Sequence, residues 1–290
     1  MDSFDLMPQL IDLTVVRAHL NREREWAAYA IGDLSPGLVD KCEWRVSADA
    51  ESALLLVYHG FDPPITFAMG DPGHLRVLFD EVRSPRISLH LRPDAVDAIA
   101  DIYAPSYTRH MCRMVLQAGK FRPASQEGVR SLSEEDLAAV SALYEDGHGT
   151  GENPTFFRAA MLRQNTYWGV WENGALVSIA GTHLYSPAFG ICAVGNVYTR
   201  SDCRGRGLGA RVTSAVVAQA IEGDVATIVL NVAHANASAR RVYERLGFNA
   251  YCDFVEGEAT RASDIGHPNS GAAAPGFHQH ERDGSSDNRH

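Results

Sequence analysis

Three glycines at alternate positions lie between a run of strand-forming residues and a run with helical periodicity. The segment Cys-Arg-Gly-Arg-Gly-Leu-Gly-Ala-Arg covers residues 203–211, between a predicted strand at 193–199 and a predicted helix at 208–222. Glycines leave backbone N–H groups unshielded, and the helix adds the positive end of its dipole. Positive charge comes from Arg204, Arg206 and Arg211. The pattern predicts a loop that binds a pyrophosphate-bearing ligand, and the alternative is a glycine-rich turn with surface arginines.

The same loop also fits a dinucleotide-binding fingerprint. Gly205, Gly207 and Ala210 satisfy the form G-x-G-x-x-A. A dinucleotide site, however, has an acidic residue at the end of the next strand, where it bonds the ribose hydroxyls. The next predicted strand, 226–232, ends in Leu-Asn-Val and lacks that acid. A nucleotide-dependent oxidoreductase is therefore the third of three functional hypotheses for this sequence.

A second motif lies downstream, at Asn-Ala-Ser-Ala-Arg-Arg-Val-Tyr-Glu-Arg-Leu-Gly-Phe, residues 236–248. Asn236 is a suitable N-cap for a short helix, and Gly247 is a suitable C-terminal stop. The apolar positions follow the helical spacing i, i+3, i+4 and i+7: Ala239, Val242, Tyr243 and Leu246. Tyr243 is therefore predicted to face inward, toward the preceding strand.

The two motifs together resemble the GNAT superfamily of acyl-CoA-dependent N-acetyltransferases. Residues 204–209 match the family's (Q/R)-x-x-G-x-(G/A) loop, and residues 236–248 match its N-x-x-A-x-x-x-Y-x-x-x-G-F segment. The motifs also stand in the family's order and at a family-like separation. The resemblance covers residues 127–255, about half of the chain.

The resemblance implies acetyl-CoA or another short acyl-CoA as co-substrate, a primary amine as acceptor, and no metal. It assigns the backbone of Val197, Tyr198 and Thr199 to the pantetheine arm. It assigns the pyrophosphate to Arg204, Gly205, Arg206, Gly207, Leu208 and Gly209. Asn236 would bond the pantetheine region. Tyr243 would stand near the thioester sulfur as general acid, and a phenol with a pKa near 10 suits the protonation of a thiolate.

The general base does not follow from the resemblance. Many family members use a glutamate on the strand before the phosphate loop, and residues 189–199 contain none. Asn196 is the side chain there with strong hydrogen-bonding capacity, so a water relayed through Asn196 and another group can take the proton. A group from elsewhere can also reach in, and the candidates are His148, Glu152, His183 and His234. A catalytically inactive CoA-binding or regulatory module is the alternative to an enzyme.

Composition narrows the class of protein further. The chain has 290 residues, 45% of them hydrophobic, with a formal net charge of −10, which disfavours nucleic acid as main partner. No apolar run is long enough for a membrane span, and the N-terminal residues carry no basic region. Five cysteines without paired spacing disfavour a disulfide framework or a zinc site. We expect a cytoplasmic protein, and the sequence leaves the oligomeric state open.

The C-terminal half is expected to be an α+β domain with a splayed, mostly antiparallel mixed sheet flanked by helices. Its predicted elements are a strand at 128–131, a helix capped at Ser133, a helix at 154–164, and strands at 167–171 and 175–185 joined by a turn at 172–174. The sheet should splay where the phosphate loop begins. Residues 129–255 are the predicted acetyltransferase domain, 121–128 a linker and 256–290 a disordered tail.

The N-terminal half, residues 1–120, shows a similar rhythm. Its predicted elements are a helix at 21–31, strands at 53–58 and 65–69, a helix over 75–82, a strand at 87–91, a helix from Pro93 and a strand at 108–116. This α/β domain is either a degenerate copy of the same fold or an unrelated one. The equivalent turn, residues 69–74, lacks both the glycines and the arginines, so we expect no CoA binding there.

Overall fold

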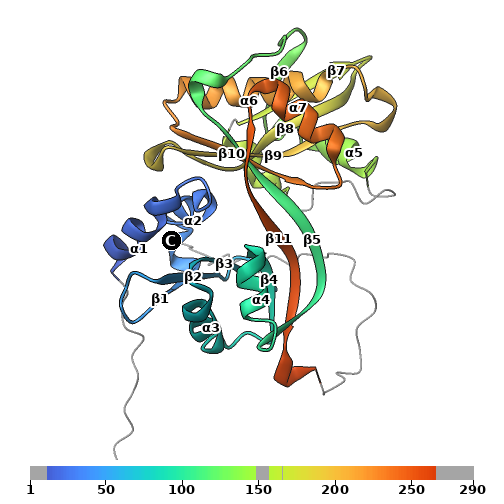
Figure 1. The fold of residues 1–290 in the computed structure, drawn as a ribbon. Helices are drawn as coiled ribbons and strands as arrows, with labels where there is room; N and C mark the ends of the chain where they lie inside the picture. The colour runs from blue at the N-terminus through green and yellow to red at the C-terminus, as the bar shows by residue number, and fades with distance from the viewer. Residues whose placement is uncertain (1–11, 148–156, 165, 266–290) are drawn as a thin grey trace, which may run out of the picture.

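The computed structural model describes residues 12–147, 157–164 and 166–265. Its strands form a single sheet in the order β1-β2-β3-β4-β11-β5-β10-β9-β8-β7-β6. Figure 1 shows two lobes that are joined by the long strands β5 and β11, which run side by side. No helix in the described ranges is long and apolar enough to cross a membrane.

The elements of the N-terminal half are α1 (Leu13–Leu20), α2 (Ala28–Gly32), β1 (Cys42–Val46), β2 (Ala53–Tyr58), β3 (Ile65–Gly70), α3 (Pro72–Asp80), β4 (Arg86–Leu91), α4 (Pro93–Ala98) and β5 (Tyr103–Leu116). Those of the C-terminal half are β6 (Val129–Leu132), α5 (Leu137–Glu145), β7 (Tyr167–Glu172), β8 (Ala175–Ser186), β9 (Ile191–Thr199), α6 (Leu208–Glu222), β10 (Thr227–Ala233), α7 (Ala237–Leu246) and β11 (Asn249–Arg261). Short 3-10 turns lie at Asn21–Glu23, Val39–Lys41, Ala118–Lys120, Glu134–Asp136, Ala159–Gln164, Pro187–Phe189, Ser201–Cys203 and Ala262–Asp264.

The two halves exchange their last strands. β5, which ends the N-terminal half, pairs with β10 of the C-terminal half from Ile228↔Leu116 to Ala233↔Met111. β11, which ends the C-terminal half, pairs with β4 of the N-terminal half from Val255↔Leu91 to Thr260↔Arg86. Each half therefore completes its part of the sheet with a strand from the other, and the two lobes share one backbone hydrogen-bond network.

Helices α1 and α2 lie where the two lobes meet. Apolar side chains of these helices and of the segment between them, among them Trp26 and Ile31, share one buried cluster with Phe67 of β3, Ile191 of β9 and Phe254 of β11. Burying a large apolar side chain stabilises a fold by about 1.5–3 kcal/mol. Residues of both halves thus stabilise this junction, and α2 is fixed against the strands that precede the predicted phosphate loop.

The structure corrects several sequence expectations. Asn21–Ile31 is not one helix, because a 3-10 turn follows α1 and α2 begins only at Ala28. Residues 159–164 form a 3-10 turn, and most of the rest of the helix predicted at 154–164 lies outside the described residues. The strand β1 was not predicted. The prediction of a disordered tail from 256 is wrong for 256–265, because β11 continues to Arg261 and is held by β4; residues 266–290 lie outside the description.

Candidate active site

Strands β9 and β10 separate halfway along their length. They pair in parallel from Thr227↔Ile191 to Leu230↔Val194, and the pairing ends there. Beyond this point β9 keeps its antiparallel partner β8, with Ser178 opposite Thr199 and Ile179 opposite Tyr198. The other edge of Val197–Thr199 is consequently not paired with β10. The sheet splays, as the sequence predicted, but it does so after Val194, several residues before the phosphate loop begins. An extended ligand segment can add to this edge as a further strand.

A β-bulge marks the point of separation. Asn196 has a φ of 52°, in the left-handed region that asparagine tolerates better than most residues. The β8–β9 register shifts between Ile179↔Tyr198 and Gly181↔Gly195, so Asn196 and Val197 together face one residue of β8. Gly195 is required beside the bulge, because a Cβ atom there would collide with the imidazole of His183.

Asn196 is buried and lies at the centre of a polar chain. Its Nδ2 donates to Tyr167 Oη at 2.7 Å, and Tyr167 in turn donates to the carbonyl of Thr182 at 3.1 Å. Its Oδ1 lies 3.2 Å from His183 Nε2. Tyr144 of α5 donates to the backbone carbonyl of Asn196 at 2.9 Å. Three neighbouring elements therefore hold both the side chain and the backbone of the bulge.

Burial sets the protonation states of this chain. It lowers the pKa of His183 to about 4, with the hydrogen bond to Asn196 opposing the shift, so the imidazole is neutral at pH 7. Burial raises the pKa of Tyr167, and the bond from Asn196 opposes this. Both groups are thus uncharged near neutral pH, and the chain works through hydrogen bonds between neutral groups.

The predicted phosphate loop connects β9 to α6. Gly207 is the N-cap of α6, with a φ of 77°, and Gly205 has a φ of 76°. In the described part of the chain no acceptor bonds the backbone N–H groups of residues 205–210, whereas the N–H of Arg211 donates to the carbonyl of Gly207. A Cβ atom at Gly205 or Gly207 would meet open space. The N–H groups at the start of α6 are therefore open to an anion.

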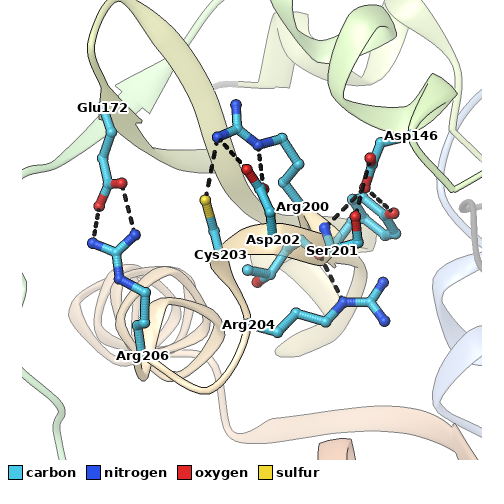
Figure 2. A network of polar contacts seen from close by, with 10 residues as sticks. Asp146, Glu172, Arg200, Ser201, Asp202, Cys203, Arg204 and Arg206 are labelled. Atoms are coloured by element: carbon cyan, nitrogen blue, oxygen red, sulfur yellow. Dashed lines mark hydrogen bonds and ion pairs between the residues drawn. The ribbon is translucent and has the colours of Figure 1, made fainter.

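The arginines of the loop differ in what they contact (Figure 2). Arg206 makes a bidentate pair with Glu172, with N–O distances of 2.7 and 2.8 Å. Arg204 donates from Nε to the carbonyl of Thr199 at 3.1 Å and lies over the ring of Tyr198. Arg206, predicted as a cofactor ligand, is thus already held by a carboxylate, while Arg204 lies at the end of β9.

An acidic residue that the sequence did not point to anchors the loop. Asp146, just after α5, accepts from the backbone N–H of Ser201 at 2.9 Å and from the hydroxyl of Tyr198 at 2.8 Å (Figure 2). These hydrogen bonds hold the pKa of Asp146 below its usual value, the bond from Ser201 contributing most. Asp146 ties α5 to the turn before the glycines. Its signal in the sequence was weak, because a single aspartate after a helix is common.

The second motif forms the helix that was predicted. Asn236 is the N-cap of α7, and its Oδ1 accepts from the N–H of Ala239 at 3.0 Å. Gly247 ends α7 with a φ of 103°. Tyr243 is 7% exposed and packs against Phe248, and its hydroxyl makes no hydrogen bond with any described residue. Burial raises the pKa of Tyr243 to about 12, so the phenol is protonated at pH 7 and can donate a proton.

The structure separates the candidates for the general base. His183 contacts Asn196 directly. His234 lies at the end of β10, where its exposed side chain pairs with Asp253 at 2.9 Å. His148 and Glu152 lie outside the described residues. Within the described ranges, no group of three or more His, Cys, Asp or Glu side chains is arranged to hold a metal ion.

The fold is that of known acetyltransferases. A GCN5-related N-acetyltransferase from Kribbella flavida superposes with a TM-score of 0.55 at 18% identity, over 81% of this chain and 95% of that one. An acetyltransferase of the GNAT family from Colwellia psychrerythraea gives 0.53 at 12% identity, over 87% and 97%. A GNAT-family protein from Novosphingobium aromaticivorans gives 0.52 at 22% identity, over 71% and 88%. The shared fold thus extends over both halves.

The sequence comparison gives the family of the C-terminal half. Residues 134–248 match the model of the acetyltransferase (GNAT) family, and this range contains both motifs. The chain therefore carries a GNAT acetyltransferase domain, as the motifs indicated. A search of curated proteins found no match.

Proposed function

We propose that this protein transfers an acetyl or short acyl group from acyl-CoA to a primary amine by direct attack. The proposal rests on three features together: the edge of Val197–Thr199 that β10 leaves unpaired, the N–H groups of residues 205–210 that no described residue bonds, and the phenol of Tyr243. A thioester cofactor with an extended arm and a pyrophosphate fits all three. Acyl-CoA supplies the activated acyl group.

The binding residues follow from this arrangement. The backbone of Val197, Tyr198 and Thr199 would pair with the amides of the pantetheine arm as an added strand. The residues from Arg204 to Gly209 would hold the pyrophosphate, mainly through backbone N–H groups and the dipole of α6. The Oδ1 of Asn236 is engaged as an N-cap, so its Nδ2 is the group proposed to bond the pantetheine region.

Two groups are proposed to act on the reaction. The amine nitrogen forms a bond to the thioester carbonyl carbon, the carbon–sulfur bond breaks, and the sulfur leaves as a thiolate. Tyr243 is proposed to donate its phenol proton to that sulfur, because its hydroxyl is protonated at pH 7 and is bonded to no described residue. Asn196, at the bulge where the strands separate, is proposed to orient the amine or the water that takes the amine's proton.

Calorimetric titration with acetyl-CoA, with NADH as control ligand, tests the cofactor. We expect saturable binding of acetyl-CoA and none of NADH; the reverse result would favour an oxidoreductase. Release of free thiol from acetyl-CoA, measured against a panel of primary amines, then tests transfer. Tight acetyl-CoA binding without turnover on any amine would support the inactive CoA-binding module instead.

Tyr243→Phe tests the acid. The variant removes only the hydroxyl, so we expect kcat to fall about 10- to 100-fold while the Kd for acetyl-CoA changes less than about twofold. Tyr185→Phe is the matched control, since Tyr185 lies at the far end of β8 and outside the proposed site. An unchanged kcat in Tyr243→Phe would remove this residue from the mechanism.

A further inference from the structure

A tyrosine of the N-terminal half reaches the polar chain of the C-terminal half. Tyr29 lies in α2, and its hydroxyl is 3.0 Å from Nδ1 of His183. His183 Nε2 in turn contacts Asn196 Oδ1 at 3.2 Å. The chain that begins at Tyr167 and passes through Asn196 and His183 thus ends on a residue from the other half.

The hydrogen atoms in this chain have one consistent arrangement. Tyr167 has a single hydroxyl proton, and its two acceptors, the carbonyl of Thr182 at 3.1 Å and Sδ of Met161 at 3.3 Å, have no proton to give. Asn196 must therefore donate to Tyr167 with its Nδ2 and present Oδ1 to His183. Nε2 of His183 then carries the proton, and Nδ1 can only accept from the hydroxyl of Tyr29.

Tyr29 is itself held in place by a buried cation. The guanidinium of Arg113, on β5, lies 4.9 Å from the centre of the Tyr29 ring. Arg113 donates to Asn231 Oδ1 of β10 at 2.6 Å and to the backbone carbonyls of Glu25 and Trp26 at 2.9 and 3.0 Å. These bonds join the segment before α2 to β10 at the residue where β10 leaves β9. The position of Tyr29 is therefore coupled to both separating strands.

We propose that Tyr29 is a positioning residue for acyl transfer, and this inference rests on the proposed function. Its hydroxyl selects the Nε2–H tautomer of His183, which fixes the side-chain amide of Asn196 at the bulge. The N-terminal half thereby contributes to the site of a reaction whose cofactor-binding residues all lie in the C-terminal half. Without the Tyr29 hydroxyl, the imidazole can rotate or change tautomer, and Asn196 Oδ1 loses the Nε2–H of His183 as its fixed donor.

A double-mutant cycle on kcat separates this role from simple packing. We expect Tyr29→Phe to lower kcat about tenfold, with the Kd for acetyl-CoA within about twofold of wild type. In the His183→Phe background, adding Tyr29→Phe should change kcat less than about twofold, because the partner of the hydroxyl is gone. Additive losses in the double variant, or an unchanged kcat in Tyr29→Phe, would overturn the proposal.

Tyr103→Phe is the matched control. Tyr103 is also buried, lies in the N-terminal half and donates to a backbone carbonyl, that of Ser84 at 2.6 Å, but it is part of a different core cluster from Tyr29. The Tyr103→Phe variant should have a lower melting temperature than the wild type but the same kcat. A loss of kcat in Tyr103→Phe equal to that in Tyr29→Phe would show a general effect of stability and overturn the specific role.

Nitrogen NMR of histidine-labelled protein tests the geometry without any turnover. We expect His183 to show the neutral Nε2–H tautomer in the wild type and a changed tautomer ratio in Tyr29→Phe. A neutral Nδ1–H tautomer in the wild type would overturn the proposal. An Nε2–H tautomer in a protein that neither binds acetyl-CoA nor turns over would instead overturn the proposed function, and with it any role of Tyr29 in transfer.

Discussion

The two halves of the molecule contain the same strand–helix–strand unit, but they satisfy the start of its helix differently. In the C-terminal half, Gly207 precedes α6, and the first N–H groups of the helix have no acceptor among the residues that the structure describes. In the N-terminal half, the carboxylate of Asp71 accepts from the N–H of His74 at 3.1 Å, and Pro72 occupies the first helical position. The protein's own carboxylate thus takes the place of an anion at α3.

The strand edges at which the parallel strands separate also differ between the two halves. β3 and β4 pair in parallel only from Ile65↔Ser88 to Phe67↔His90, so they separate as β9 and β10 do. Here, however, the indole N–H of Trp26 donates to the carbonyl of Ala68 at 3.0 Å, just past the last pair. In the N-terminal half the protein's own side chains thus fill the place that the same topology leaves open in the C-terminal half. This difference supports the prediction that CoA does not bind in the N-terminal half.

The largest effect on stability is expected when the side chain of Trp26 is removed. Trp26 is fully buried and packs against Phe67 and Phe254. We expect Trp26→Ala to lower the free energy of unfolding by about 4 kcal/mol, because it leaves a large cavity. Urea denaturation measures the loss. Trp26→Phe keeps most of the packing and should cost less; a cost below about 1 kcal/mol for the alanine variant would mean that the indole does not fill this edge.

A carboxylate placed at the start of α6 should reproduce the arrangement that Asp71 makes at the start of α3. Gly207→Asp places a carboxylate at the N-cap of α6, as Asp71 does at α3. We expect the Kd for acetyl-CoA to rise about 100-fold, since the carboxylate competes for the N–H groups and repels the pyrophosphate. Gly207→Asn, which has similar left-handed strain without the charge, should raise the Kd less than about tenfold. Equal effects of the two variants would assign the loss to the backbone instead.

The pH dependence of the unfolding free energy tests whether the carboxyl group of Asp33, in the N-terminal half, is buried away from water. Asp33, at the end of α2, has its pKa raised to about 7 by burial. Between about pH 4 and 7 the folded state keeps this proton and the unfolded state does not, so stability falls as pH rises through that window. We expect the advantage of Asp33→Asn over wild type in unfolding free energy to grow by about 2 kcal/mol from pH 5 to pH 8. A constant difference would mean that water reaches the carboxylate.

The smallest expected effect concerns Arg206. Because Glu172 already holds its guanidinium on an exposed surface, Arg206→Ala should raise the Kd for acetyl-CoA less than about threefold. Arg204→Ala should raise it more, since Arg204 lies beside the end of β9. Titration at equal ionic strength compares the two variants. A larger loss for Arg206 would mean that its pair with Glu172 opens when the ligand binds.

Much of the C-terminal half was predictable because its signals are local. Each predicted feature depends on residues that are close in sequence. Examples are the helix α6, the turn at Asn173-Gly174, and the caps Asn236 and Gly247. Both family motifs depend on such local signals as well. The sequence therefore indicated the glycine-rich loop, the helix α7 and a splayed sheet, although the strands separate earlier than predicted.

The missed features depend on contacts between distant segments. Nothing near Glu256 indicated that β4 would extend the last strand, and a polar tail followed. The contact between Tyr29 and His183 joins residues that are 154 positions apart, and the pair of Glu172 with Arg206 joins a hairpin to a loop. Periodicity within a single segment carries no information on such partners.

The exchange of strands also has a consequence for synthesis on the ribosome. Arg86–Leu91 of β4 pairs with Val255–Thr260 of β11, so the sheet of the first lobe cannot close until nearly all of the described chain has emerged. Until then β4 presents an unpaired edge, the kind of surface on which nascent chains aggregate or are bound by chaperones. Long sequence separation also slows folding. The protein should therefore mature late, with both lobes closing in one step.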